Sequence, residues 1–225
     1  MRSTALNLIL APAVLLALAG CGRLFFDDSL NVQQGATTGV TTTTATDASA
    51  FTGVTCDQRV TAGTALSVVA FEALLSSGAS PASPYTVCLE QGVTVTGASN
   101  SIDINATNLR IIGPTSGTAP VLTDISIVSN GAGAEITLEN LTVSGDGSGS
   151  AMYISGTSTK ILKNSTVSAP GTTEHAIAFD ISVSACVLKV IGSVVQALGA
   201  GNSAAMYLDA GGSLSNVIEI SGGSV

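Results

Sequence analysis

The chain has 225 residues, of which 45% are hydrophobic, 10% charged and 4% aromatic. The hydrophobic fraction excludes a disordered chain, and the charged fraction is too low for a coiled coil. A formal charge of -8 with only seven lysines and arginines argues against nucleic acid as a partner, and the single histidine, His175, excludes a multi-histidine metal site.

Residues 1–20 have the layout of a secretory signal peptide. Arg2 supplies a positive start, and an apolar run over residues 8–19, too short for a membrane-spanning helix, is followed by a small residue. The run ends in the sequence LAGC at residues 18–21, which resembles the lipobox of bacterial lipoproteins.

The lipobox resemblance implies cleavage before Cys21, a diacylglycerol thioether on Cys21 and an acylated new N-terminus. Several acyl chains, at roughly 0.8 kcal/mol per buried CH₂, anchor a protein stably to a membrane. In that family, Gly22 in place of an aspartate favours the outer membrane of the bacterial cell envelope. The alternative is an ordinary signal peptide with an incidental cysteine.

Residues 21–50 are expected to form a lipidated, flexible tether. Residues 31–50 are rich in threonine, glycine and alanine and lack an apolar period. An irregular first strand is the alternative, because threonine tolerates β structure. The remaining residues, 51–225, are expected to form one domain.

Three cysteines remain for this domain. Cys56 and Cys88 lie in strand-like sequences, and an exported compartment permits a disulfide between them, although the sequence leaves the pairing open. Cys186 is expected to be a buried, unreactive thiol.

The domain contains a repeat. Three segments align without gaps at residues 151–155, 176–180 and 205–209, and each precedes a second similar strand, at residues 161–167, 189–195 and 219–225. The second strand also occurs at residues 137–143. A spacing of roughly 24 to 30 residues predicts the coils of a solenoid rather than a sandwich of two sheets.

Alternation within the strands predicts which side chains face the core. One inward column holds Met152, Ile177 and Met206, and the next holds Ile154, Phe179 and Leu208. The second strand contributes Leu138, Leu162, Val190 and Ile220, followed by Val143, Val167, Val195 and Val225. Like residues would stack about 4.8 Å apart and form a continuous aliphatic core.

The corner between the last two columns holds Asn140, Asn164, Gly192 and Gly222. Asparagine and glycine both tolerate a left-handed backbone, so a one-residue bend is predicted there, with Asn108 as a possible earlier member.

These coils, with the phrases NLRIIG (108–113) and ITLENLTVSG (136–145), resemble the right-handed parallel β-helix, or pectin-lyase-like, superfamily. The resemblance implies an all-β solenoid, in which a short N-terminal helix often caps the first coil. Residues 64–77 fit such a helix, with Thr64 as N-cap and Gly78 after its end. Its apolar face would hold Leu66, Val69, Ala70, Ala73 and Leu74.

The printed chain stops at Val225 in the middle of a strand register, without a cover for the last apolar layer. We expect either a truncated product or self-association of that end with another copy.

Asp180 and Asp209 are the best candidates for catalysis. They occupy the same outward position in adjacent coils, and such a pair could share a proton, bind Ca²⁺ or flank a glycosidic bond. Ser155 occupies that position in the preceding coil, and no lysine or arginine shares the strand. The family's enzyme signatures are absent as runs, so two solvated surface acids are the alternative.

Tyr153 and Tyr207 form an outward column two coils apart, with Asp180 and Asp209 beside them. Aromatic rings with polar neighbours suit sugar rings, so a glycan-binding face is predicted here, flattened by Ala151, Ala176 and Ala205. The alternative is the ordinary preference of tyrosine for exposed strands.

His175, in a predicted loop beside Glu174, has no nucleophile tied to it by a motif. Residues 144–150, SGDGSGS, resemble a calcium loop only weakly, because Asp146 is their sole carboxylate. No resident metal or cofactor is therefore expected, apart from this weak calcium candidate.

The sequence predicts a lipid-anchored envelope protein whose β-helix has a structural, adhesive or glycan-binding role. The partners would be the membrane, through Cys21, and an envelope or host glycan. The rival is a polysaccharide lyase or glycoside hydrolase acting on acidic polysaccharide through Asp180 and Asp209.

Overall fold

A computed structural model describes residues 40–41, 50–76, 84–96, 101–105, 108–129, 134–180, 186–209 and 217–225 of the chain. The predicted signal peptide and Cys21 lie outside these residues, as does most of the predicted tether.

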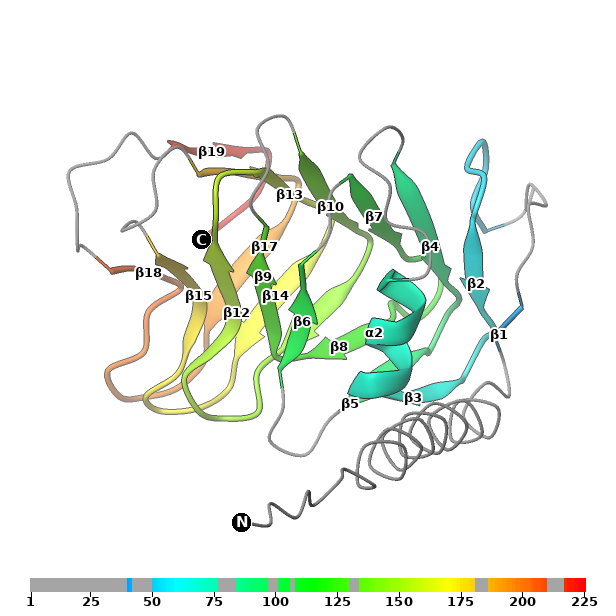
Figure 1. Cartoon of the computed structure of the whole chain (residues 1–225). Coiled ribbons are helices and arrows are strands. Elements are labelled where there is room, and N and C mark those ends of the chain that lie inside the picture. Colours follow the sequence, from blue (N-terminus) through cyan, green and yellow to red (C-terminus); the bar gives the residue numbers. More distant parts are fainter. Residues whose placement is uncertain are drawn as a thin grey trace, which may run out of the picture. The chain divides into compact units, whose positions relative to one another are not determined.

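The described residues form a parallel β-solenoid of about five turns, built from three sheets (Figure 1). Sheet 1 contains, in spatial order, β1 (Val40–Thr41), β2 (Gln58–Val60), β4 (Tyr85–Leu89), β7 (Leu109–Ile112), β10 (Glu135–Glu139), β13 (Thr159–Lys163), β16 (Val187–Ile191) and β19 (Val217–Ser221). Sheet 2 contains β3 (Ala65–Ser67), β5 (Thr94–Thr96), β8 (Val121–Thr123), β11 (Thr142–Ser144), β14 (Thr166–Ala169) and β17 (Val194–Ala197). Sheet 3 contains β6 (Ile102–Ile104), β9 (Ile125–Val128), β12 (Ser150–Ser155), β15 (His175–Asp180) and β18 (Met206–Asp209). Each coil from β4 to β18 therefore gives one strand to every sheet.

The strand register confirms the predicted core columns. Pairing from one coil to the next joins Met152 to Ile177 and Ile177 to Met206. In the same way it joins Leu138 to Leu162, Leu162 to Val190 and Val190 to Ile220. In the middle coils these side chains are fully buried and belong to one continuous hydrophobic cluster. Stacking of aliphatic columns along the solenoid thus supplies the main driving force for folding.

The predicted corners are also confirmed. Asn140, Asn164, Gly192 and Gly222 all have positive φ, from 48° to 61°. Asn108 shares the conformation, with φ 53°, but it precedes β7, whereas the four corner residues follow a sheet 1 strand. Its assignment to their column was therefore wrong.

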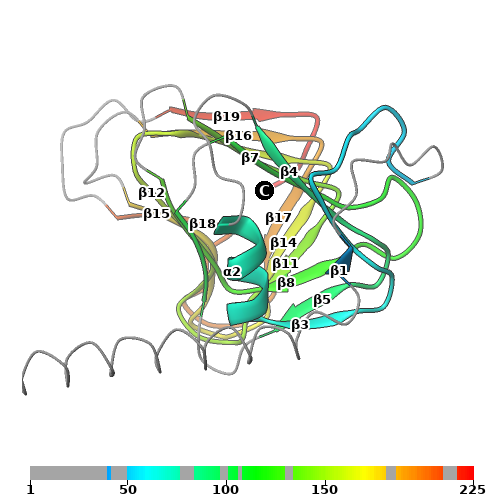
Figure 2. The same cartoon turned by 45° about the vertical axis from the view of Figure 1, so that its right-hand side comes forward.

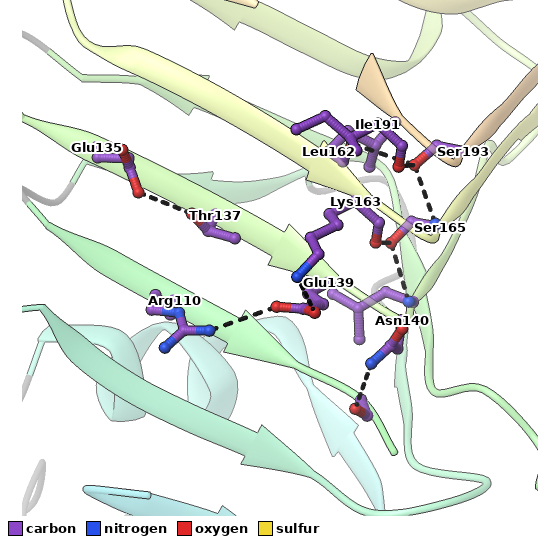
Figure 3. Close-up of polar contacts among 12 residues, drawn as sticks. Arg110, Glu135, Thr137, Glu139, Asn140, Leu162, Lys163, Ser165, Ile191 and Ser193 are labelled. Carbon is purple, nitrogen blue, oxygen red and sulfur yellow. Dashed lines mark hydrogen bonds and ion pairs between the residues drawn. The ribbon is translucent and has the colours of Figure 1, made fainter. Parts of the chain in front are cut away.

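A ladder of buried serines follows the corner (Figure 3). The amide of Leu141 donates to Ser165 Oγ at 3.1 Å, and the amide of Ser165 donates to Ser193 Oγ at 3.0 Å. Ser193 Oγ also lies 3.1 Å from the Leu162 carbonyl oxygen. Each hydroxyl satisfies backbone groups that the sharp bend withdraws from the sheets.

The predicted helix is shorter than expected. Residues 65–67 pair with β5 as strand β3, and the helix, α2, spans Val68–Ser76. The amide of Ala70 donates to Ser67 Oγ at 3.3 Å, so Ser67 rather than Thr64 is the N-cap. The predicted apolar face is also wrong at Val69, which is 67% exposed.

The buried face of α2 consists of Val68, Phe71 and Leu75. The helix contacts β3, β5 and β6, and Figure 2, viewed nearly along the solenoid axis, shows it near β3 and β5. Gly78, the predicted residue after the helix, lies outside the described residues.

Cys56 and Cys88 are joined by a disulfide, with their Cα atoms 5.7 Å apart. Together with Phe51 and Ile112 they form a second small buried cluster outside the main core. Beyond β2, Val40 and Thr41 of β1 pair antiparallel with it, within the segment predicted as a tether.

The apolar columns emerge into solvent at the last coil. The residues equivalent to Leu208 and Ile220 in earlier coils are buried. In the last described coil, however, Ile220 is 48% exposed and Leu208 is likewise exposed. Self-association through this end stays a prediction.

Burial along one column predicts a graded response to truncation. Leu162→Ala should lower the free energy of unfolding by about 2–5 kcal/mol, because it opens a cavity between two packed neighbours. Ile220→Ala, in the same column but half exposed, should cost less than half as much. Urea unfolding measures both values, and equal losses would contradict column stacking as the source of stability.

Candidate functional site

Sheet 3 brings the predicted site residues together. Tyr153 is paired with Ala178 and Ala178 with Tyr207, so the two tyrosines share a column two coils apart, as expected. Asp180 is directly paired with Asp209 in the neighbouring coil. Adjacent coils of such a sheet lie about 4.8 Å apart, so an extended ligand could contact several of these positions.

Asp180 accepts two hydrogen bonds on the outer surface of this sheet. Tyr153 donates its hydroxyl to Asp180 Oδ2 at 3.0 Å, and Ser155 donates to the same oxygen at 3.4 Å. These donors hold the carboxylate and fix the direction of the Tyr153 ring. Tyr153 and Asp180 thus form one connected polar unit across β12 and β15.

His175 forms a stack with Tyr207. The two ring centroids lie 4.5 Å apart and the planes differ by 7°. The amide of Ala204 donates to His175 Nδ1 at 3.1 Å, which helps to fix the imidazole against the phenol. His175 is the first residue of β15, so its prediction as a loop residue was wrong.

The alanines predicted to flatten the face do not lie on it. Ala151 and Ala176 are fully buried within the main hydrophobic cluster, and Ala205 is partly buried against it. They lie close to the corner where the chain enters sheet 3, and they pack toward the core. The accessible face therefore starts at the tyrosine column.

A cluster of three carboxylates lies where the chain passes from sheet 2 to sheet 3. Asp124, Asp146 and Glu174 come from three successive coils, and their carboxylate oxygens lie within 4.8 Å of one another. Asp146 was expected to be the sole carboxylate of its loop, but the fold adds one from the coil on each side.

Glu174 is fully buried yet hydrogen-bonded in this cluster. It accepts from the amide of Gly171 at 2.9 Å and from that of Gly147 at 3.3 Å. A side chain at Gly145 would collide with the Glu174 carboxyl group, so the close approach requires glycine there.

Burial and the neighbouring charge of Asp146 raise the pKa of Asp124 to about 6. Asp124 also has a left-handed backbone, with φ 48°, and its Oδ1 accepts from the amide of Asp146 at 3.1 Å. The cluster consists of oxygen atoms, the ligands that hard cations such as Ca²⁺ prefer. Backbone amides donate hydrogen bonds to all three carboxylates, and these bonds hold the cluster in place without an ion.

Lys160 is buried inside the solenoid, in register with Ile136 and Leu188. Its ammonium donates to the Gly156 carbonyl at 2.8 Å and to Cys186 Sγ at 3.4 Å. Burial lowers the pKa of Lys160 and raises the pKa of the Cys186 thiol. Cys186 is thus a buried thiol, as expected.

The outer surface of sheet 1 carries ion pairs (Figure 3). Glu139 lies 2.8 Å from Lys163 and 3.4 Å from Arg110, so one glutamate joins three coils. Nearby, Arg59 pairs with Glu90 at 2.6 Å at the margin of an open polar pocket of about 330 Å³. None of the predicted site residues lines that pocket.

A scan of family models, a search of curated proteins and a search of solved structures each found no match to this chain. The part of the chain that the structure describes contains no helix long and apolar enough to cross a membrane. The function is therefore inferred from the residues of sheet 3 and its margin.

The raised pKa of Asp124 predicts a pH-dependent stability. The folded state binds this proton more tightly than the unfolded chain, so stability should fall as pH rises from about 4 to 6. Asp124→Asn, which keeps a residue tolerant of left-handed φ, should remove that fall. The variant should therefore be more stable than the wild type at neutral pH. Thermal unfolding across this pH range measures it.

Asp103→Asn is the matched control, because Asp103 is an exposed aspartate of sheet 3, outside the cluster. Equal pH profiles for wild type and Asp124→Asn would contradict the assignment.

The same titration with added Ca²⁺ examines the weak calcium candidate. A rise in melting temperature that only Asp124→Asn abolishes would support calcium at the cluster, and no rise would exclude it.

Proposed function

We propose that this protein is a lipid-anchored module of the bacterial cell envelope whose sheet 3 binds glycan. The tyrosine column carries this proposal, because it gives an extended sugar two aromatic positions with carboxylate and hydroxyl groups beside them. Sugar rings stack on aromatic faces and form hydrogen bonds with such polar groups. The role needs no resident cofactor.

The proposed fold family is the right-handed, pectin-lyase-like β-helix, with α2 as its N-terminal cap. The parallel three-sheet coils and asparagine corners support this assignment. In the first coil, α2 follows β3 at the point where later coils form a sheet 3 strand, and it packs against β6. Its buried Phe71 belongs to the same cluster as the aliphatic columns.

The proposed location rests on residues 1–22. The apolar run and the LAGC sequence support cleavage before Cys21 and lipidation of its thiol, and Gly22 favours the outer membrane. A threonine-rich segment would then separate the solenoid from the lipid.

Lipidation predicts a change in mass and in partitioning. In a bacterium that processes lipoproteins, the full chain should incorporate labelled palmitate and enter the detergent phase, because acyl chains favour an apolar environment. Cys21→Ser should abolish both properties, whereas Cys186→Ser, a change at a buried thiol, should preserve them. Label retained by Cys21→Ser would refute the anchor.

Glycan binding predicts retention on a polysaccharide without cutting it. Tyr207→Ala should weaken retention more than Tyr153→Ala, because Tyr207 is 45% exposed whereas Tyr153 is partly buried. Loss of one aromatic contact corresponds to about 0.5–1.5 kcal/mol, or roughly two- to tenfold in affinity. Affinity electrophoresis through gels containing each polymer measures it.

Tyr85→Ala is the matched control, since Tyr85 is the remaining tyrosine and lies on β4 of sheet 1. Equal losses for all three variants, or no retention of wild type on any glycan, would refute the proposed face.

The second candidate is a polysaccharide lyase or glycoside hydrolase, favoured by the direct pairing of Asp180 with Asp209. Such an enzyme should release shortened product from acidic polysaccharide and lose that activity in Asp180→Asn. Retained polymer of unchanged length favours the binding module instead.

A further inference from the structure

The charges of the described strands are divided among the three sheets. Among the described residues, lysine and arginine occur only on strands of sheet 1, at Arg59, Arg110, Lys160, Lys163 and Lys189. The four outer cations pair with Glu90, Glu139 or Glu219 at 2.6–3.4 Å. Sheet 1 therefore neutralises its own charges.

Sheet 2 carries no charged residue on any of its described strands. Their sequences are ALS, TVT, VLT, TVS, TVSA and VVQA, from β3 to β17. Its outer surface offers hydroxyl, amide and aliphatic groups, so it provides no electrostatic attraction for a charged ligand.

Sheet 3 and its margin are acidic. The described strands carry Asp103, Asp180 and Asp209 and no lysine or arginine. Asp124, Asp146 and Glu174 add carboxylates where the chain enters β9, β12 and β15. Lysine and arginine are thus absent from the described strands of the sheet that carries the exposed Tyr207.

The aromatic groups lie on the same acidic sheet. The exposed Tyr207 stacks on His175, and the Tyr153 hydroxyl binds Asp180. An ammonium group near such rings gains cation–π attraction in addition to the attraction of the carboxylates. A uronate polymer would instead meet like charge on β6, β15 and β18.

We infer that the glycan bound by sheet 3 carries free amino groups, as an amino-sugar polymer does. This inference rests on the proposed function, because it names the ligand class of the same tyrosine column. The sugar rings would lie against Tyr153 and Tyr207, and the ammonium groups would lie against the aspartates. Acidic polysaccharide, the substrate class of the rival enzyme, is disfavoured.

The experiment compares chitosan, chitin and polygalacturonate with the full chain. Chitosan and chitin share a backbone and differ in acetylation of the amine, so their comparison isolates the positive charge. At mildly acidic pH, where the amines are protonated and the exposed carboxylates ionised, retention should be highest on chitosan, lower on chitin and absent on polygalacturonate. Added salt should weaken only the chitosan interaction.

Variants separate this sheet from the general attraction of an acidic protein to a polycation. Asp180→Asn and Asp103→Asn should each lower chitosan affinity about two- to fivefold, the range of an exposed ion pair. Glu219→Gln removes the same charge from sheet 1 and should leave affinity unchanged. Circular dichroism checks that each variant is folded.

Each outcome tests either the amino-sugar inference or the proposed glycan-binding function on which it rests. Equal retention on chitosan and chitin, or preference for polygalacturonate, overturns the amino-sugar inference and preserves glycan binding. Equal losses in Asp180→Asn and Glu219→Gln, or displacement by polylysine but not by chitosan oligosaccharides, show attraction by net charge and also overturn the inference. No retention on any polymer refutes the proposed function itself.

Discussion

The structure depends on the parallel, in-register stacking of one coil on the next. Because each strand pairs with its equivalent in the neighbouring coil, every inward position becomes a column of like side chains. Leu162, for example, lies between Leu138 and Val190, and all three are fully buried. The same register carries outward residues into columns of fixed spacing, so packing inside and ligand positions outside have a common cause.

The corners make that register possible. A bend of one residue requires a left-handed backbone, which asparagine and glycine adopt at low cost. It also removes amide groups from the sheets, and buried Ser165 and Ser193 accept hydrogen bonds from them. Side chains at the corners therefore complete a hydrogen-bond network that the strands alone would leave unsatisfied.

The solenoid, its columns and its corners could be predicted because they follow from short-range alternation and from a repeat. Lys160, two residues before Leu162, is buried as well, but this was not predicted, because a lysine is an unexpected member of an aliphatic column. Helix α2 was predicted too long, because residues 65–67 satisfy helical and strand periodicity equally and pairing with β5 decides between them.

The carboxylate cluster and the ring stack could not be predicted in the same way. One residue, Asp124, precedes β9, whereas five residues precede each of β12 and β15. Asp146 and Glu174 occupy different positions within those two connections, so a repeat alignment does not place the three carboxylates together. His175 pairs with Ser150, and Tyr207 pairs with Ala178, so their rings meet diagonally between columns. Contacts between residues that are not paired in the strand register can be found only from the three-dimensional path of the chain.

The division of charge among the sheets shows how one repeat can supply different surfaces. A solenoid exposes each sheet separately, so substitutions on one outer column leave the core and the other sheets unchanged. Sheet 1 uses this freedom for ion pairs that bridge coils, such as those of Glu139 with Arg110 and Lys163. Sheet 3 keeps its carboxylates apart from those cations, and at its margin burial and the neighbouring charge of Asp146 raise the pKa of Asp124. A ligand that carries ammonium groups, as proposed, would supply the positive charge that the described strands of sheet 3 lack, and it would bind along the column of tyrosines and aspartates.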